Sequence, residues 1–562
     1  MRTNRDDSTF PCDDAGSMRL PKVIGYDAEL GNYISGLQLR NGTGREASHA
    51  LIREVSGITG LSTRHFENCP CERCERRRDE LLRAAQRAGT AGTGWGYFVN
   101  TYPVLDGMSL AKKNDDPQDH DRRYLAENGG CIYIDLNHLE LCLPETRSAL
   151  DHVACWHAGL RIVRRAMDAA NAGQPEGRRV HVLVNNSDGS GNSYGSHLNF
   201  LVTRRCWQSI FERKMQYLLF LAAYQASSVV FAGQGKVGSE NGAPDVHFQL
   251  SQRADYFEQI VGSQTTCNRP IVNSRDEPLC GDYDYHRGLS DPFEGNRSRV
   301  HVIFYDNTLC HVSTLLKAGV MQIILAMIEA GFVERRLILD DPLAAVRAWS
   351  HDPGLRAKAS LFSGERVSAV EMQYQFLEEA TRFVSRGDCE GIVPDAQLIL
   401  DTWGDTLALL EQRDVAALSR KVDWALKLTL LEGVMSEHGD LDWAHPAVKR
   451  LDHVYSSLDA GEGLYWACER DGHVERVVAE KDISRFESNP PEDTRAWARA
   501  MLIRRIGADR IEEMNWDHIR YIEGDDYWTR RHRTIELPDP LGPGKNCIEN
   551  ADSTVSTKRS TQ

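Results

Sequence analysis

The sequence predicts an α+β fold, with an antiparallel sheet in the first part of the chain and helices after it. Three runs alternate as half-exposed strands do, at residues 180–184, 197–202 and 300–304. From about residue 315 the apolar spacing becomes helical, for example over residues 407–431. Together these patterns favour a sheet with one polar face that is backed by helices.

Composition describes an ordinary soluble globular protein of more than one domain. The 562 residues are 41% hydrophobic and 26% charged. The net charge of −15 argues against nonspecific binding to nucleic acid. Residues 1–17 lack the apolar core of a signal peptide, and the apolar run 217–232 is too short to span a bilayer, so we expect a buried helix there. No membrane partner is expected. The 14 cysteines are mostly scattered, which suits a reducing cytoplasm better than a disulfide framework.

Sequence patterning divides the chain into four parts. We expect disordered tails at residues 1–20 and 546–562, a large domain at 21–440 and a small C-terminal domain at 441–545. A long insertion occupies residues 36–127 of the large domain and contains a charged helical stretch at 72–87. Loops of this length are usually functional lids or disordered segments.

The segment YIDLNHLELCLPE at residues 133–145 is the most informative part of the sequence. Residues 131–134 have the apolar character of a strand, and acids follow at Asp135 and Glu140. Alternate side chains of a strand share a face, so Tyr133, Asp135 and Asn137 are expected to point the same way. Because closely spaced carboxylates repel each other unless a cation or a proton is shared, this segment indicates a metal or acid/base site. The alternative is a polar strand end at the protein surface.

Several further segments occur in the same order as in one known family. They are GYDAELG at 25–31, NNSD at 185–188, SYGSHLN at 193–199, SQRAD at 251–255, NSRDEP at 273–278 and PPEDTR at 490–495. With residues 133–145, they resemble the Pup ligase and depupylase family, relatives of glutamine synthetase, from about residue 21 to about residue 500. The resemblance implies a concave antiparallel sheet of glutamine-synthetase type, backed by helices.

The resemblance also implies the site residues. Asp135 matches the catalytic carboxylate, and the metal-binding positions match Asp27, Glu29, Glu140 and His197. Mg²⁺ prefers oxygen ligands and usually shares them with nucleotide phosphates. The expected cofactors are therefore Mg²⁺ and ATP, or ADP plus phosphate. The positions expected to bind the nucleotide are Tyr133, Asn199, Arg253, Arg275 and Trp424.

Some of these assignments have competing explanations. Each arginine could instead form a surface ion pair, and Trp424 could be a core residue of an amphipathic helix. Four positions also depart from the family pattern and could weaken nucleotide binding or turnover. They are Asp27 (glutamate in relatives), Cys131 (arginine), Leu143 (threonine) and Leu198 (an acidic residue).

Two short motifs imitate other enzyme classes. Residues 233–238 spell G-x-G-x-x-G, but a dinucleotide site needs a strand before it and a helix after it. Here a helix is predicted before it, and Gly242 and Pro244 follow too soon for a useful helix. Residues 191–195 spell G-x-S-x-G, but the nucleophile elbow of hydrolases requires a following helix, whereas residues 197–202 alternate like a strand.

A possible zinc site lies inside the insertion at His65, Cys69, Cys71 and Cys74. One histidine and three cysteines suit tetrahedral Zn²⁺, although structural sites usually draw ligands from two separated knuckles. The alternative is a turn with reduced thiols.

The resemblance implies an enzyme that acts on a small protein modifier. We expect an ATP- and Mg²⁺-dependent depupylase/deamidase that hydrolyses the isopeptide bond or the C-terminal glutamine amide of a Pup-like modifier. Three features favour this branch: the spacing of five between Asp135 and Glu140, the form of residues 248–256, and the long insertion. The alternatives are a Pup–protein ligase and a catalytically weak modifier-binding homologue. The expected partners are the modifier and its conjugates, with an indirect link to a proteasome.

Overall fold

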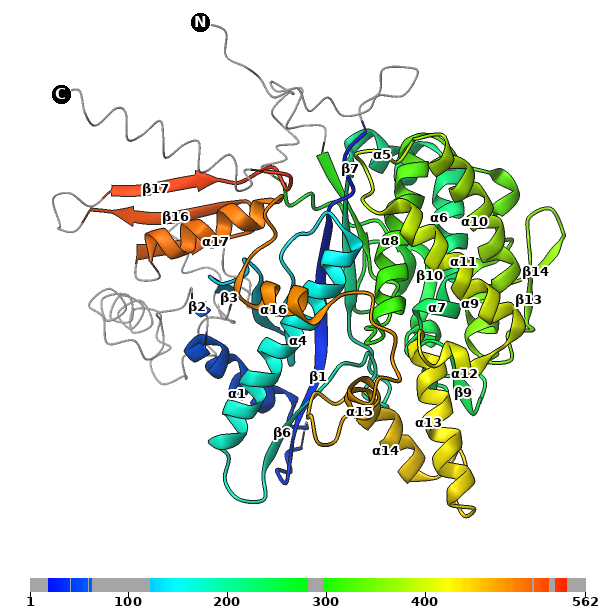
Figure 1. Ribbon diagram of the computed structural model, residues 1–562, viewed down its shortest axis with the longest axis horizontal. Coiled ribbons are helices and arrows are strands. Elements are labelled where there is room, and N and C mark those ends of the chain that lie inside the picture. Colours follow the sequence, from blue (N-terminus) through cyan, green and yellow to red (C-terminus); the bar gives the residue numbers. More distant parts are fainter. Residues whose placement is uncertain are drawn as a thin grey trace, which may run out of the picture.

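The computed structural model describes residues 19–40, 42–58, 60–62, 122–280, 297–507, 510–524 and 531–542 (Figure 1). The predicted helix at 72–87, the candidate zinc cluster and most of both predicted tails lie outside these residues. The N-terminal tail was predicted two residues too long, because Arg19 and Leu20 are already buried. Leu20 packs with Val23 and Leu201, so the ordered fold begins just before the first strand.

An eight-stranded sheet forms the centre of the described part of the chain. Seven strands lie in the order β12-β7-β1-β5-β4-β3-β2, and β6 pairs with the far part of β1. The strands are β1 (Ile24–Ser35), β2 (Gly60–Ser62), β3 (Arg123–Leu125), β4 (Cys131–Asp135), β5 (His138–Cys142), β6 (Arg179–Leu183), β7 (Ser196–Thr203) and β12 (Arg297–Val302). All of these pairings are antiparallel, which confirms the predicted sheet.

Side chains of the long central strand β1 alternate between the two faces of the sheet. Its residues Tyr26, Ala28 and Leu30 are buried in the core, whereas Asp27 and Glu29 between them are only partly buried. β1 runs from Ile24 to Ser35 and includes both acids. The strand continues because its alternate residues are apolar and fill the core, so both acids are held on a rigid element.

Helices and small sheets surround the central sheet. The helices are α1 (Gly44–Ile58), α4 (Ala149–Ala172), α5 (Arg204–Gln208), α6 (Met215–Ser227), α7 (Val229–Ala232), α8 (His311–Glu329), α9 (Pro342–Ser350), α10 (Ala369–Ser385), α11 (Ala396–Gln412), α12 (Val415–Leu418), α13 (Asp423–Glu437), α14 (Pro446–Tyr455), α15 (Leu464–Arg470), α16 (Glu480–Ser488) and α17 (Arg495–Ile506). The short strands are β8 (Lys236–Val237), β9 (Phe248–Gln249), β10 (Phe257–Gly262), β11 (Arg269–Asn273), β13 (Lys358–Ser360), β14 (Arg366–Ser368), β15 (Ile511–Met514), β16 (His518–Glu523) and β17 (Arg531–Glu536).

The predicted helical stretch 407–431 is interrupted. It covers the end of α11, all of α12 and the first half of α13. Arg413 ends α11 in the left-handed region with φ of 55°, and the Asp414 side chain then accepts a hydrogen bond from Ala417 N to begin α12. An aspartate favours a helix start because its carboxylate satisfies a free backbone N–H.

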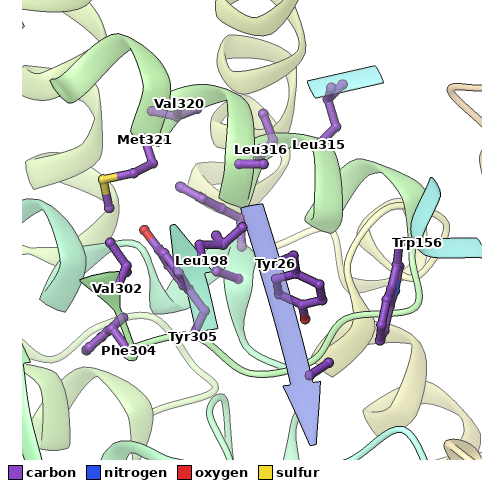
Figure 2. Packing of buried hydrophobic residues seen from close by; sticks show 14 of the residues in the cluster. Tyr26, Trp156, Leu198, Val302, Phe304, Tyr305, Leu315, Leu316, Val320 and Met321 are labelled. Carbon is purple, nitrogen blue, oxygen red and sulfur yellow. The ribbon is translucent and has the colours of Figure 1, made fainter. Parts of the chain in front are cut away.

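Helices α4 and α8 cover the apolar face of the sheet. Figure 2 shows the middle of this core, where Tyr26 of β1 lies between Trp156 of α4 and Leu198 of β7. The Tyr26 and Trp156 rings meet edge to face, with their centroids 5.1 Å apart. Among the described residues, α8 alone is long and apolar enough to cross a membrane, but it is completely buried in the protein. It is therefore a core helix.

A second, smaller core lies at one end of the sheet. It joins Tyr124, Tyr133 and Cys142 of the sheet to residues of α17 and of the sheet β15-β16-β17. Figure 1 shows this unit at the upper left, away from the helices α6 to α11 on the right. It begins at α17, well after the domain boundary predicted near residue 440; the helices α14 to α16 pack with the large core instead. The division into a 21–440 and a 441–545 domain stays a prediction.

A buried ion-pair group fastens this unit to the central sheet. Glu145, which follows β5, accepts hydrogen bonds from Arg495 Nε at 2.8 Å and from two nitrogens of Arg499. Burial alone would raise the Glu145 pKa, but the two arginines outweigh burial and lower this pKa to about 2.

Glu145→Gln is expected to lower the free energy of unfolding by about 3 kcal/mol at neutral pH, because it leaves two buried guanidinium groups without a counter-charge. A depressed carboxyl pKa stabilises the fold above the unfolded value, near 4, and this contribution fades as the pH falls toward 2. The loss should therefore shrink in acid, as measured by urea unfolding at pH 7 and pH 3. An equal loss at both values would contradict the ionic origin.

Candidate active site

Three carboxylates from three neighbouring strands converge on the polar face of the sheet. Glu29 of β1 pairs in register with Glu140 of β5, and Asp135 ends β4. Their oxygens all lie within 4.8 Å of one another. Oxygen donors gathered in this way fit a hard divalent cation such as Mg²⁺. The structure thus brings the predicted catalytic acid together with two of the four predicted metal positions.

Glu140 is the most deeply buried of these acids. Its side chain is fully buried, and the hydroxyl of Tyr133 donates a hydrogen bond of 2.5 Å to it. Burial first, and then the charges of Asp27, Glu29 and Asp135, raise the Glu140 pKa well above its usual value. A bound cation would relieve both effects, because it supplies the positive charge that the buried carboxylate lacks.

The other two predicted metal positions form a group beside the carboxylates. Asp27 accepts hydrogen bonds from His197 Nδ1 at 2.9 Å and from Asn199 Nδ2 at 2.6 Å. This arrangement leaves His197 Nε2 facing away from Asp27. A carboxylate that holds one imidazole nitrogen fixes the ring so that the other nitrogen can bind a metal.

Gly195 lies directly before β7 and against two side chains of the site. Its backbone N–H donates to Glu29 Oε2 at 2.8 Å. A Cβ at this position would lie 2.3 Å from His197 Nε2, so any other residue would collide with the imidazole. The glycine is required by the close approach of backbone to both side chains.

The turn that follows Asp135 has an unusual conformation. Asp135 pairs with His138, so only Leu136 and Asn137 form the turn between β4 and β5. Leu136 adopts a left-handed φ of 51°, which is strained for a branched side chain, and this side chain is 72% exposed. An exposed leucine beside the acids can make apolar contact with a bound polypeptide.

These groups line one large cavity of about 1200 Å³. Tyr133, Asn199 and Arg275, which were predicted to bind nucleotide, also line it. Beyond the predicted set, the cavity includes Arg299 and His301, which project from β12. Arg299 Nη1 and His301 Nδ1 both lie within hydrogen-bonding distance of Asn199 Oδ1, at 2.9 and 2.7 Å. The alternation of polar and apolar residues along β12 was the sequence signal that could have predicted Arg299 and His301 as site residues.

Charge changes sign across the cavity floor. The acids lie on β1, β5 and β4, whereas Arg299 lies on β12 at the opposite edge of the sheet. Arg275 lies at the same end, because Arg275 and Arg299 both form ion pairs with Glu277. A ligand with phosphate groups could contact the arginines while a cation joins its phosphates to the acids.

Two of the predicted nucleotide contacts are not in this cavity. Arg253 is almost fully buried, and its guanidinium donates to the backbone carbonyls of Tyr194 and Ile303. Trp424 is fully buried on α13, where its indole N–H donates to Val230 O at 2.8 Å. Trp424 is therefore a core residue, as the competing explanation held. Arg253 is a buried structural residue that joins the backbone at Tyr194 to the backbone at Ile303.

Arg253→Met and Arg275→Met form a matched pair that tests this distinction. Arg253→Met should lower the free energy of unfolding by about 3 kcal/mol, because it leaves two buried carbonyls unpaired. Nucleotide affinity of the folded fraction should hardly change. Arg275→Met removes a half-exposed guanidinium from the cavity and should weaken nucleotide binding with little loss of stability. Urea unfolding and calorimetric titration with Mg²⁺ and ADP give both quantities, and the reverse pattern would restore Arg253 as a ligand contact.

The structure shows where the departures from the family pattern lie. Leu198 alternates away from His197 and packs into the core (Figure 2), so its side chain takes no place from the metal site. Cys131 is buried in the second core, and Leu143 is buried at the edge of the cavity. Asp27 keeps two hydrogen-bonded partners.

Neither imitated motif has the required geometry. Gly233 ends α7, and the short strand β8 follows at Lys236, so no helix begins at the glycines of residues 233–238. Residues 191–195 lie in a loop that leads into β7 rather than into a helix. Both predictions against a dinucleotide site and a nucleophile elbow are confirmed.

The antiparallel sheet carries acids on its open face and helices on its other face, which makes the protein an α+β fold. The Pup-ligase protein family model matches residues 68–520, and the chain belongs to this family. This confirms the family and the fold class that the sequence predicted.

Its relatives carry two different activity names. The chain is 35% identical to the Pup deamidase/depupylase of Mycolicibacterium smegmatis over 475 residues, which cover 82% of this chain and 89% of that protein. It is 34% identical to the Pup–protein ligase of Paenarthrobacter aurescens over 424 residues, which cover 74% and 86%. Identity alone therefore does not separate the two activities.

Solved structures agree with the fold. A complex of Pup with its ligase PafA superposes with a TM-score of 0.69 at 20% identity, covering 95% of this chain and 93% of that one. PafA in complex with ADP gives 0.64 at 23% identity, covering 81% and 94%.

Proposed function

We propose that this protein is a nucleotide- and Mg²⁺-dependent hydrolase that removes a Pup-like modifier from lysine side chains and deamidates the modifier's C-terminal glutamine. The observation that carries this proposal is the convergence of Glu29, Asp135 and Glu140 on the floor of a large cavity with arginines at its other end. The cavity of about 1200 Å³ exceeds the usual size of a small-molecule pocket, which leaves room for a nucleotide and a polypeptide tail.

The residues of the site divide into three roles. Glu29 and Glu140, with Asp27 and His197 beside them, would hold Mg²⁺, which polarises phosphate and carbonyl oxygens. Arg275, with Asn199 and Tyr133, would hold the nucleotide. Asp135 would act on the amide carbonyl, as a nucleophile or as the base that activates water.

Hydrolysis balances simply. Water adds across the amide, the C–N bond breaks, and the products are a glutamate carboxylate on the modifier and either a free lysine amine or ammonia. Asp135 would take the proton from water or form a transient acyl bond that water then opens. Exposed Leu136 beside it is placed to contact the modifier tail.

Three features support cleavage over ligation. The spacing of five between Asp135 and Glu140 resembles the depupylase branch, and it corresponds here to a hairpin with a two-residue turn. Residues 248–256 and the long insertion also resemble that branch. The second candidate is a Pup–protein ligase, which the equally similar ligase relatives favour. There Asp135 would deprotonate the incoming lysine after ATP has phosphorylated the modifier's C-terminal glutamate.

The deciding experiment uses three parallel reactions with purified protein, ATP and Mg²⁺. The first contains a preformed modifier–protein conjugate, the second the modifier ending in glutamine, and the third the modifier ending in glutamate with a lysine-bearing target. We expect release of the modifier in the first, ammonia in the second and no conjugate in the third. Conjugate that accumulates in the third while the first is unchanged would establish the ligase.

The remaining expectations stay predictions. All nine cysteines in the described part of the chain are free, which suits a cytoplasmic enzyme. Nothing supports zinc at His65, Cys69, Cys71 and Cys74, which lie outside the described residues.

A further inference from the structure

A second group of metal-ligating side chains lies where three helices meet, outside the active-site cavity. His157 comes from α4, His311 begins α8 and Glu469 comes from α15. Their ligand atoms lie within 4.8 Å of one another, and none of the three lines the active-site cavity. The proposed function does not use them.

Both imidazoles are buried with nitrogens that lack a hydrogen-bond partner. His157 is 2% exposed and His311 is fully buried. His157 Nε2 and both nitrogens of His311 have no hydrogen-bond partner. A buried polar atom without a partner is costly and calls for an explanation, for which an ion or a water is the usual answer.

Other contacts orient the rings for ligation. The backbone of Leu309 lies close enough to His157 to oppose the lowering of its pKa, and His157 Nε2 is buried without a partner. Metal-binding histidines commonly donate one N–H to a carbonyl and present the other nitrogen to the ion. The two rings are tilted by 32° with centroids 4.1 Å apart, and His311 Nε2 lies 3.6 Å from Glu469 Oε1. That gap is too long for a hydrogen bond, but it is close to the spacing of about 3.3 Å between two ligands of one tetrahedral ion with bonds near 2.0 Å.

The charge balance permits a cation. Arg161 and Arg476 lie nearby, but their charges are met by Glu480 and Glu487, with Arg161 2.6 Å from Glu480 and 3.2 Å from Glu487. Burial lowers the pKa of both imidazoles, so they are neutral, the form that ligates metals.

We propose that His157, His311 and Glu469 bind a divalent transition-metal ion, with Zn²⁺ the best match to two imidazoles and one carboxylate. Water would complete the tetrahedron, and it would enter at Glu469, whose side chain is 16% exposed while the imidazoles are enclosed. The ion joins α15 to α4 and to the start of α8. The segment just before α8 contains Asn307, whose side chain donates to Glu29 O in the central sheet, so the ion stiffens a region that supports the active site.

Cobalt titration tests this proposal. All arms use the full chain with Cys69, Cys71 and Cys74 changed to serine and with saturating Mg²⁺ and ADP, so that neither those thiols nor the active-site acids capture the probe. After removal of metal by a chelator, we expect one equivalent of Co²⁺ to give the intense visible absorption of tetrahedral coordination, and Zn²⁺ to displace it. His157→Gln and Glu469→Gln should weaken Co²⁺ binding by about tenfold or more.

His152→Gln is the matched control, because His152 is also buried on α4 with an unpartnered Nε2 but does not belong to the cluster. It should bind Co²⁺ as the parent does. Zn²⁺ should also raise the melting temperature of the parent but not that of Glu469→Gln. This variant is chosen because Glu469 is more exposed than the two histidines, so its replacement should disturb folding least. Absence of tetrahedral Co²⁺ absorption in the folded parent, or equal losses in His152→Gln and His157→Gln, would overturn the proposal and leave a water-bridged pair. Since these readouts do not involve turnover, they are independent of the proposed function.

Discussion

Asp135→Asn is expected to reduce the rate of modifier release by at least about 10³-fold while nucleotide affinity stays within a few fold. The amide is nearly isosteric with the carboxylate but can neither accept a proton nor attack a carbonyl, and a positioned base or nucleophile typically contributes 10² to 10⁴ in rate. Asp135 ends β4 opposite His138, so the strand pairing that positions it should persist. The measurement is single-turnover cleavage of a conjugate, with binding of Mg²⁺ and ADP by calorimetry.

Asp405→Asn serves as the control, because Asp405 is an exposed aspartate on α11 and does not line the cavity. It should leave both quantities unchanged. If Asp135→Asn retained the parent rate, Asp135 would only contribute charge to the metal site. If it lost nucleotide affinity together with rate, the residue would be a ligand of the cation, which its distance to Glu29 and Glu140 also permits.

The polar face of the sheet could be predicted because it depends on local pattern. The resemblance gave Asp27, Glu29 and His197 as metal positions, and the alternation of residues 197–202 predicted the strand that carries His197. Register then brings Asp27 opposite His197 and Glu29 opposite Glu140. Pattern also excluded the two imitated motifs, since each requires a helix at a position where the sequence cannot continue one.

What could not be predicted depends on contacts between distant segments. Arg253 belongs to a motif that matches the family, but its direction is set by the carbonyls of Tyr194 and Ile303, far away in sequence. Arg299 and His301 were missed because the predicted strand began at residue 300, after Arg299, and neither residue belongs to a segment that matches the family. Glu145 and its arginine partners are about 350 residues apart, and no local signal links them.

Glu140→Gln is expected to reverse its effect on stability when Mg²⁺ and ADP are added. In the metal-free protein, burial and the neighbouring acids raise the Glu140 pKa, so the ionised side chain destabilises the fold at neutral pH. Removing the charge should therefore raise the melting temperature in chelator. The difference should vanish in acid, below the usual carboxyl pKa near 4, where the side chain is protonated in both the folded and the unfolded chain.

With Mg²⁺ and ADP present, the order of stability should invert. The parent gains stability in proportion to its affinity for the ligand, whereas the variant has lost a carboxylate from the cation site and should bind the complex about tenfold more weakly or worse. The Tyr133 hydroxyl can still donate to the glutamine oxygen, so local packing is retained. Thermal melts in chelator and in saturating Mg²⁺ and ADP measure both effects. If the variant is less stable than the parent in chelator, structural contacts hold Glu140 in place. If Mg²⁺ and ADP raise both melting temperatures equally, the cation lies elsewhere. The pKa of Glu140 is raised by burial and by its acidic neighbours, and a carboxylate in that position is stable in its charged form only when a positive charge joins it.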